Sequence, residues 1–143
     1  MNQKAVFVDR DGTLVEEVNY LHRVEDLRFF PFTDECVRTL KGLGFLVIMV
    51  TNQSGIGRGV YTEDDMHSVN SRIQADLSIE LDAIFYCPHL PDAGCRCRKP
   101  STGMLEAAME RFQIDIGSSW MIGDKLLDIE FGHRGGLRSI LVR

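Results

Sequence analysis

Short apolar runs alternate along the chain with longer segments in which apolar residues recur every three or four positions. The apolar runs predict strands, and the longer segments predict helices. The expected strands span residues 4–8, 45–50, 83–87, 120–122 and 139–142. The expected helices span residues 33–43, 62–80, 102–112 and 125–132, with Thr33 and Thr62 as N-caps. This alternation indicates a three-layer α/β fold with a mainly parallel sheet and right-handed crossovers.

One segment interrupts the alternation, between residues 15 and 32, and we expect a flap or hairpin there. With 143 residues the chain is long enough to bury a sizeable core, and we assign residues 1–143 to one domain. The spacing of the predicted strands leaves no room for an inserted cap domain. Cys36 lies in an apolar helical pattern, which predicts a core thiol.

The charge and the hydropathy exclude two classes of partner. A net charge of −5 gives no general attraction to nucleic acid or to anionic lipid. The longest apolar run, residues 45–50, is far too short to span a membrane, and the first residues lead into a strand rather than a signal peptide. We therefore expect a cytoplasmic protein, monomeric by default, that binds neither nucleic acid nor a membrane.

Polar motifs follow four of the predicted strands. They are Asp9-Arg10-Asp11, Thr51-Asn52-Gln53-Ser54-Gly55, Arg98-Lys99-Pro100 and Gly123-Asp124-Lys125. Each motif has a simpler interpretation when it is taken alone, because Asp and Gly favour turns and Lys99 suits a solvated surface. The carboxyl ends of parallel strands, however, meet at one edge of a sheet, where ligands bind. The joint order of the motifs therefore predicts one shared site.

Asp9 and Asp11 leave the first strand on the same side of the backbone, so that they can share a ligand. Two crowded carboxylates repel each other, and a divalent cation relieves the repulsion. We predict Mg²⁺, bound by Asp9, Asp124 and the backbone carbonyl of Asp11, with the Lys125 backbone as a further ligand. Asp9 is then the candidate nucleophile for a phosphoryl group, and Asp11 the candidate acid and base.

Other polar residues of the same loops fit the phosphoryl group. Lys99 would supply a fixed positive charge against its oxygens, and the Thr51 hydroxyl would bind another of them. Asp128 follows Asp124 by one helical turn, where it would hold Lys125 or a metal-bound water. These assignments together predict phosphate-ester hydrolysis at the edge of the sheet.

Cys87, His89, Cys95 and Cys97 form the spacing Cys-x-His-x5-Cys-x-Cys in one short loop. Three thiolates and one imidazole complete a tetrahedral Zn²⁺ site that has no open position for catalysis. Zinc would order a loop with little apolar material of its own, and would thereby position the two cationic residues that follow. A Cys95–Cys97 or Cys87–Cys95 disulfide is the alternative, which a reducing compartment disfavours.

These motifs resemble the signature of the haloacid dehalogenase-superfamily phosphatases. That signature runs D-x-D-x-T, then a strand-end Thr or Ser, a Lys and an acidic G-D motif. The matching residues here are Asp9-Arg10-Asp11-Gly12-Thr13, Thr51, Lys99, and Gly123-Asp124-Lys125 with Asp128. The match covers nearly the whole chain, and it implies a Rossmann-like fold, Mg²⁺ dependence and an aspartyl-phosphate intermediate.

The zinc loop narrows the resemblance to two branches, the heptose 1,7-bisphosphate phosphatases and the histidinol-phosphate phosphatases. Residues 51–59, 103–105 and 19–22 are similar to the heptose branch. The five residues between His89 and Cys95 resemble the histidinol branch, and Thr102 stands where the heptose branch often has Pro. The resemblance favours hydrolysis of the 7-phosphate of a small phosphorylated sugar, with histidinol phosphate as the alternative. A non-enzymatic phosphoacceptor or zinc-binding interaction module is disfavoured, because neither needs an acid to protonate a leaving alkoxide.

The resemblance also implies which residues surround the substrate. They are Glu17, Val18, Asn19 and Tyr20, then Thr51, Asn52, Gln53 and Ser54, and finally Arg98 and Lys125. Arg98 would form a bidentate contact with the second phosphate or with sugar hydroxyls. A salt bridge to a loop carboxylate is the simpler interpretation of Arg98.

Overall fold

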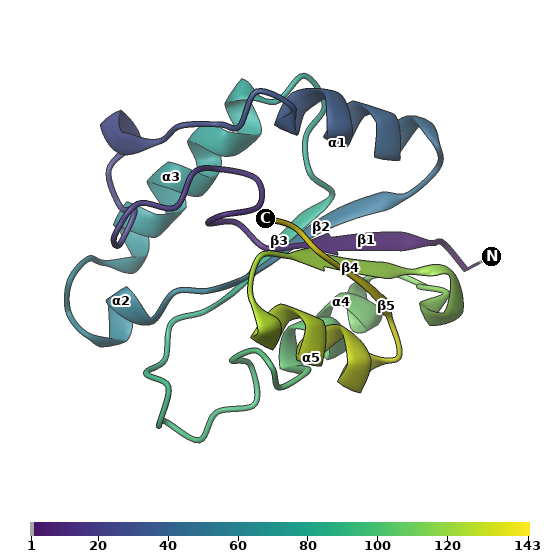
Figure 1. Ribbon diagram of the computed structural model, residues 1–143. Coiled ribbons are helices and arrows are strands. Elements are labelled where there is room, and N and C mark those ends of the chain that lie inside the picture. Colours follow the sequence, from purple (N-terminus) through teal and green to yellow (C-terminus); the bar gives the residue numbers. More distant parts are fainter. Residues whose placement is uncertain (1) are drawn as a thin grey trace.

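The computed structural model describes residues 2–143, whose five strands form one parallel sheet. The strands are β1 (Ala5–Val8), β2 (Leu46–Asn52), β3 (Ala83–Cys87), β4 (Trp120–Gly123) and β5 (Arg138–Leu141). Their order in the sheet is β3-β2-β1-β4-β5 (Figure 1). The chain therefore builds the sheet from β1 to one side and then returns to build the other side, which reverses the strand order at β1.

Helices cover both faces of the sheet. They are α1 (Thr33–Gly42), α2 (Ser54–Gly57), α3 (Glu63–Asp76), α4 (Gly103–Arg111) and α5 (Leu126–Gly135), with 3-10 turns at Val24–Asp26 and Ile116–Ser118. α1 and α3 lie on one face, and α4 and α5 lie on the other (Figure 1). The predicted three-layer α/β fold with a parallel sheet is confirmed.

Buried apolar side chains form one cluster on each face. Phe7 and Ile48 of the sheet belong to the cluster that contains Leu105 of α4 and Phe131 of α5. The other cluster contains Val6, Val8, Val47 and Met49 of the sheet, Val37 of α1, and Val69 and Ile73 of α3. Successive residues of a strand point to opposite faces, so β1 and β2 need apolar residues at nearly every position. This requirement explains why the sequence identified both strands.

Two predictions for α1 are wrong. Thr33 is not an N-cap, because its hydroxyl donates a hydrogen bond to the Leu14 carbonyl at 2.6 Å. Phe32 precedes the helix instead, and it provides no side-chain cap. Cys36 is exposed rather than part of the core, because the fully buried residues of α1 are Thr33 and Val37.

The C-terminal ends of α3 and α5 both differ from the prediction. Thr62 is the N-cap of α3 as predicted, and it forms a reciprocal capping box with Asp65. α3 ends four residues early, whereas α5 continues three residues beyond Gly132 to Gly135. Gly132 lies inside the helix and does not end it. A Cβ at this position would lie 2.1 Å from Ser139 Oγ of β5. The glycine instead permits close packing of helix on strand.

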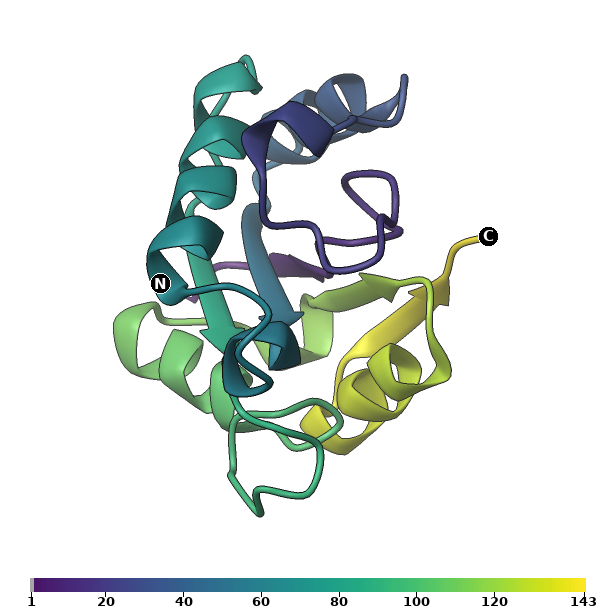
Figure 2. The ribbon, with the colours of Figure 1, turned by 90° about the vertical axis from the view of Figure 1, so that its left-hand side faces the viewer.

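The segment from residue 15 to residue 32 begins and ends as a narrow hairpin. Val15 forms an isolated antiparallel bridge with Phe29, and the Glu16 N–H donates to the Arg28 carbonyl at 2.8 Å. Figure 2 looks onto the edge at which the strands end, where this segment, α2 and the loop after β3 surround the strand ends. These three segments frame the site described below.

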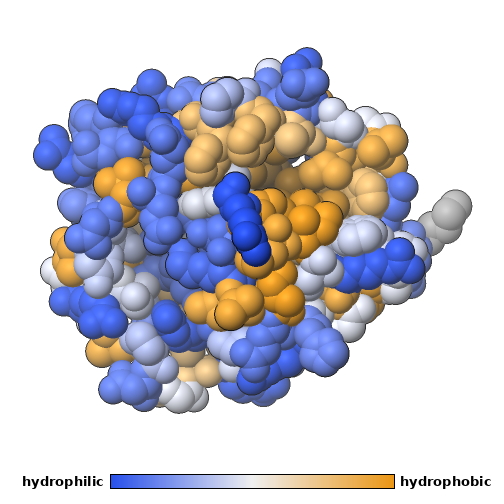
Figure 3. Space-filling model, viewed as in Figure 1, coloured by the Kyte–Doolittle hydropathy of each residue, from blue (hydrophilic) through white to orange (hydrophobic). Residues whose placement is uncertain are grey.

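The surface is not evenly polar. In the view of Figure 3, hydrophobic residues gather around the start of α1 and along β4 and β5, and hydrophilic residues dominate the side that carries α2. Large exposed apolar side chains include Phe32 and Leu43 next to α1, and Ile140 and Leu141 of the edge strand β5. Among residues 2–143, no helix is long and apolar enough to cross a membrane.

Candidate active site

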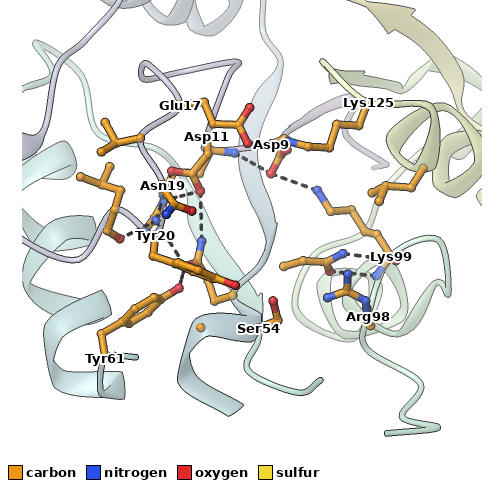
Figure 4. A pocket seen from close by; sticks show the side chains of 17 residues that line it. Asp9, Asp11, Glu17, Asn19, Tyr20, Ser54, Tyr61, Arg98, Lys99 and Lys125 are labelled. Carbon is orange, nitrogen blue, oxygen red and sulfur yellow. Dashed lines mark hydrogen bonds and ion pairs between the residues drawn. The ribbon is translucent and has the colours of Figure 1, made fainter. Parts of the chain in front are cut away.

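A pocket of about 270 Å³ opens at the carboxyl edge of the sheet, next to the end of β1 (Figure 4). Most of the residues predicted from the sequence line it. They are Asp9, Asp11, Glu17, Val18, Asn19, Tyr20, Asn52, Gln53, Ser54, Arg98, Lys99 and Lys125. β1 lies where the strand order reverses, which is the usual ligand position in open α/β sheets. The strand-end loops therefore meet as the sequence predicted.

Asp9 and Lys99 face each other across the floor of this pocket (Figure 4). Lys99 Nζ lies 3.0 Å from Asp9 Oδ1 and 2.7 Å from Asp128 Oδ1, and it donates a hydrogen bond to the Val50 carbonyl at 2.8 Å. The Lys99 side chain is 1 % exposed, so water barely screens its charge. The simpler interpretation of Lys99 as a solvated surface charge is wrong.

Asp124 and Asp128 form a cluster with Asp9, in which one oxygen of each lies within 4.8 Å of the others. Both oxygens of Asp128 have partners, because Oδ1 accepts from Lys99 and Oδ2 accepts from the Lys125 backbone N–H at 3.2 Å. Asp124 Oδ1 is buried without a hydrogen-bond partner among residues 2–143. Burial raises the pKa of both Asp124 and Asp128, and the charge of Asp9 raises each pKa further. Asp124 is thus the carboxylate with a free, buried acceptor.

A glycine permits the close approach of the first and fourth strand-end loops. Gly12 has a φ of +83°, a conformation that other residues rarely adopt. A Cβ at this position would lie 2.2 Å from Asp124 Oδ2. The loop after β1 therefore packs against Asp124 only because residue 12 lacks a side chain.

Arg10 and Tyr61 line the pocket, although the sequence analysis gave neither a role. Arg10 is buried and forms an ion pair with Asp11, with Nε 3.1 Å from Oδ2. The Tyr61 hydroxyl donates to the Gln53 side-chain oxygen, and burial raises the Tyr61 pKa to about 12. Gln53 donates in turn to the Thr51 hydroxyl at 2.8 Å. Thr51 is fully buried and does not line the pocket, so its contact with phosphate stays a prediction.

Arg98 and Lys125 add two cations to the pocket. Arg98 Nη1 is buried without a hydrogen-bond partner, and none of the ion pairs found among residues 2–143 includes Arg98. The simpler interpretation of Arg98 as half of a salt bridge therefore has no support in the structure. Lys125 Nζ lies 3.2 Å from Glu17 Oε1 and 3.5 Å from Asp124 Oδ2. Burial lowers the Lys125 pKa, but these two carboxylates together raise it above its ordinary value.

Cys87, His89, Cys95 and Cys97 converge next to the pocket, with all four ligand atoms within 4.8 Å of one another. Cys87 Sγ lies 3.4 Å from His89 Nδ1, 3.6 Å from Cys95 Sγ and 2.7 Å from Cys97 Sγ. A disulfide joins its sulfurs at about 2.05 Å. Sulfur atoms that share a tetrahedral zinc ion lie about 3.8 Å apart. The distance from Cys87 to Cys95 matches this value, whereas the distance from Cys87 to Cys97 is shorter than in a zinc site and longer than in a disulfide. All the cysteines are free, so the structure has neither of the two alternative disulfides. The four side chains thus offer the donor set of a structural zinc site.

A parallel sheet with paired aspartates after its first strand and a buried lysine near them defines the class of HAD-like hydrolases. A family model described as HAD-hydrolase-like matches residues 96–143. The D-glycero-alpha-D-manno-heptose-1,7-bisphosphate 7-phosphatase of Photorhabdus laumondii is 42% identical, over 98% of this chain and 82% of that protein. The D-glycero-beta-D-manno-heptose-1,7-bisphosphate 7-phosphatase of Escherichia coli K12 is 40% identical, over 88% of this chain and 71% of that protein. The chain belongs to the family of D-glycero-D-manno-heptose-1,7-bisphosphate 7-phosphatases.

A solved structure agrees with this assignment. The D,D-heptose 1,7-bisphosphate phosphatase of B. bronchiseptica, complexed with magnesium and phosphate, aligns with a TM-score of 0.89 and 29% identity. The alignment covers 96% of this chain and 79% of that one. The resemblance to the haloacid dehalogenase superfamily, and to its heptose branch, is therefore confirmed.

Proposed function

We propose that the chain is a Mg²⁺-dependent phosphatase that removes the 7-phosphate of D-glycero-D-manno-heptose 1,7-bisphosphate. The observation that carries the proposal is the pair of Asp9 and Lys99, a carboxylate and a buried cation 3.0 Å apart at the floor of a pocket. The names of the relatives supply the substrate. The pocket supplies the cations that a doubly phosphorylated ligand needs, in Arg98 and Lys125.

The donor set at the end of β1 fits Mg²⁺. This hard cation prefers oxygen ligands, and Asp9 and Asp124 offer carboxylate oxygens close to each other. The buried Asp124 Oδ1 has no partner among the described residues, so a cation would satisfy it. Asp128 is less suited as a ligand, because Lys99 and a backbone N–H already use its oxygens. When bound, Mg²⁺ would neutralise charge on the phosphoryl oxygens.

In the first half-reaction, one Asp9 oxygen attacks the phosphorus of the 7-phosphate, and the bond from phosphorus to the sugar oxygen breaks. Asp9 Oδ1 is oriented by Lys99 and by the Arg10 backbone N–H, which donates at 2.8 Å. Lys99 also offsets the repulsion between the carboxylate and the phosphate dianion. Asp11 gives its proton to the departing alkoxide, because an unprotonated sugar alkoxide is a poor leaving group.

In the second half-reaction, Asp11 is a carboxylate and takes a proton from a water molecule. That water attacks the phosphorus of the aspartyl-phosphate, and the bond between phosphorus and the Asp9 oxygen breaks. Inorganic phosphate leaves, and Asp11 is again protonated for the next turnover. The same side chain therefore acts as acid and then as base, which requires it to stay near the phosphorus throughout.

The second phosphate of the substrate would contact Arg98. Its buried Nη1 lacks a partner among the described residues, and a guanidinium group suits bidentate contact with phosphate oxygens. Lys125 would approach the same ligand after exchange of its exposed contact with Glu17. A substrate with one phosphate would leave the Arg98 donor unsatisfied, so the pocket favours a bisphosphate.

We also propose that the cluster of Cys87, His89, Cys95 and Cys97 binds one structural Zn²⁺. The support is the convergence of three sulfurs and one imidazole nitrogen within 4.8 Å. The loop that holds them is largely exposed and contributes little to the apolar core, so a metal would supply its order. Zinc here would stabilise the position of Lys99, which follows Cys97 by two residues.

Turnover of defined substrates tests the proposal. The purified protein is incubated with Mg²⁺ and the α or β anomer of the heptose 1,7-bisphosphate, and ³¹P NMR identifies which phosphate is lost. Multiple turnovers that yield heptose 1-phosphate are expected, with a higher kcat/KM than for histidinol phosphate. Loss of the 1-phosphate, or a preference for histidinol phosphate, would contradict the assigned substrate. A single turnover without release of phosphate would indicate a phosphoacceptor.

A matched pair of variants tests the nucleophile. Asp9→Asn should abolish turnover and formation of a phosphorylated enzyme, because an amide oxygen is a weak nucleophile. Asp64→Asn removes an exposed carboxylate in the first turn of α3, and it should leave kcat/KM unchanged. Turnover retained in a clean Asp9→Asn preparation would rule out an aspartyl-phosphate on this residue.

A further inference from the structure

The side chain of Arg10 is buried in the wall of the active site, with 1 % of its surface exposed. A buried guanidinium is tolerated only when its N–H groups find partners. Its Nε donates to Asp11 Oδ2 at 3.1 Å, and its Nη2 donates to Asp11 Oδ1 at 3.3 Å. Both oxygens of one carboxylate are therefore held by one rigid fork, which fixes the plane of the Asp11 carboxylate.

The remaining donors of Arg10 tie it to three other segments. Nη2 shares its two hydrogens among three acceptors, which are Asp11 Oδ1, the Leu21 carbonyl at 3.1 Å and Gln53 Oε1 at 3.2 Å. Nη1 donates to Asn70 Oδ1 at 3.2 Å. Gln53 returns to the same carboxylate, because its Nε2 donates to Asp11 Oδ2 at 3.3 Å. Arg10 thus connects Asp11 to the loop before α1, to the loop after β2 and to α3.

Asn70 is the most distant of these partners in sequence and the least expected. It lies in the middle of α3, 60 residues after Arg10, and is 4 % exposed. A guanidinium has only donors, so Asn70 must turn its oxygen toward Arg10. Its Nδ2 is then left buried without a partner among residues 2–143. A buried amide that leaves its own donor unsatisfied in order to accept from Arg10 indicates a role beyond packing.

We propose that Arg10 is a positioning residue for Asp11, and that Asn70 holds the Arg10 fork in its orientation. The inference rests on the proposed function, because that function assigns the proton transfers to Asp11. A freely rotating Asp11 carboxylate would meet the departing alkoxide in the wrong orientation for much of the time. The fork removes that freedom. Within residues 2–143, Oδ2 accepts hydrogen bonds from both Arg10 and Gln53, whereas Oδ1 accepts only one, so Oδ1 keeps a lone pair for the proton that passes to the substrate. The Asp11 side chain is 21 % exposed, which leaves it accessible from the pocket.

The leaving group distinguishes positioning of an acid from general support of the fold. A sugar alkoxide must be protonated as it leaves, whereas p-nitrophenolate leaves without a proton. The value of kcat/KM reports only the steps up to release of the leaving group, so the later hydrolysis of the aspartyl-phosphate does not affect the comparison. We therefore measure kcat/KM for the heptose bisphosphate and for p-nitrophenyl phosphate in each variant.

Arg10→Met, Arg10→Lys and Asn70→Leu are the test variants. Arg10→Met should lower kcat/KM for the sugar substrate about 100-fold, which is at the low end of the effect of a general acid. The same variant should lower kcat/KM for p-nitrophenyl phosphate less than about fivefold. Arg10→Lys should remain nearly as defective, because an ammonium keeps the charge but cannot form the fork. Asn70→Leu should show the same selectivity at about a tenfold loss on the sugar substrate, since the fork is loosened rather than removed.

Two controls separate positioning from folding. Gln74→Leu removes another amide from α3, one that exchanges hydrogen bonds with the Leu81 backbone and has no contact with Arg10. It should lower the thermal midpoint without changing the ratio of the two kcat/KM values. In every variant, the first-turnover burst of p-nitrophenolate counts the folded chains that can be phosphorylated. A variant of Arg10 that does not fold leaves Asn70→Leu to decide the question.

Equal losses on both substrates, wild-type behaviour of Arg10→Lys, or an unchanged ratio in Asn70→Leu would overturn the inference. Failure of the proposed function looks different, because the wild type would then form no aspartyl-phosphate with either substrate. If the wild type prefers another alkyl phosphate, that ester replaces the heptose bisphosphate and the comparison of leaving groups is unchanged.

Discussion

Removal of the buried Lys99 ammonium should destabilise the fold strongly. Lys99 Nζ lies 3.0 Å from Asp9 Oδ1 and 2.7 Å from Asp128 Oδ1, so each charge pair amounts to about 5–6 kcal/mol at an effective dielectric constant near 20. Desolvation of the ions offsets most of that attraction in the intact site. In Lys99→Met, two buried carboxylates lose their common cation and keep their desolvation cost. We expect the free energy of unfolding at pH 7 to fall by about 3–5 kcal/mol.

Urea denaturation in buffer without Mg²⁺ or chelator measures this loss, and the thermal midpoint should fall by roughly 9 to 15 °C for a chain of this size. The deficit should depend on pH. Burial and Asp9 raise the pKa of Asp128, and Lys99 lowers it, so the variant raises that pKa further. A carboxyl group whose pKa is higher in the folded state than in the unfolded state stabilises the fold at pH values below the unfolded-state pKa. This stabilisation is lost as the pH rises through the folded-state pKa. The deficit should therefore shrink as the pH falls toward 4.

Lys125→Met is the matched control, because Lys125 belongs to the same site and its side chain is 43 % exposed. Its ion pairs with Glu17 and Asp124 are screened by water, so its loss should cost about 0–1 kcal/mol. Equal effects of the two substitutions, or a Lys99→Met deficit that is the same at every pH, would refute the argument from burial.

Three further predictions concern the metals and the loop after β1, which packs against Asp124. The protein as purified should contain about one zinc per chain, and a chelator or Cys97→Ser should lower the thermal midpoint; full stability without zinc would contradict this. Gly12→Ala should cost about 1–2 kcal/mol from its φ of +83° and raise the Mg²⁺ concentration for half-maximal activity, because its Cβ would meet Asp124. Without added Mg²⁺, the free energy of unfolding should fall as the pH rises above about 4, since the pKa values of Asp124 and Asp128 are raised in the fold. Saturating Mg²⁺ should reduce that slope, because it binds the ionised carboxylates, and equal slopes with and without Mg²⁺ would argue against a metal at this position.

The strands were predictable because buried parallel strands are apolar on both faces, and each run here is bounded by polar residues. The helix ends were less predictable, because tertiary contacts decide them. Glycine is common at helix ends, and the sequence therefore predicted that the helix ends at Gly132. The helix instead continues, and the missing side chain of Gly132 lets it pack closely against Ser139. Thr33 was predicted to be an N-cap, but its hydroxyl donates a hydrogen bond to the Leu14 carbonyl. The four-residue α2 has two glycines and is too short to show helical periodicity, so no sequence pattern predicts it.

The site was predictable where its chemistry is local. Three of its residues closely follow a predicted strand or the zinc loop, namely Asp9, Lys99 and Asp124. Their place at one edge of the sheet therefore followed from the rule that the carboxyl ends of parallel strands meet at one edge. Tyr61 had a weaker signal, because it precedes the N-cap Thr62 at the spacing from Met66 that favours a hydrophobic staple. That pattern predicts burial of Tyr61 but not its hydrogen bond to Gln53.

The link between the two candidate metal sites needed the structure, because it is made by Asn52 and Gln53, which belong to neither set of candidate metal ligands. Asn52 accepts a hydrogen bond from the Lys99 N–H at 2.9 Å and donates one to the Lys99 carbonyl at 3.2 Å. The next N–H, that of Gln53, donates to the Cys87 carbonyl at 2.7 Å. The end of β2 thus contacts Lys99 and the first candidate zinc ligand at consecutive residues. Disorder of the zinc loop would therefore displace Lys99 through the backbone that joins Cys97 to Lys99. This effect requires no direct contact between zinc and substrate.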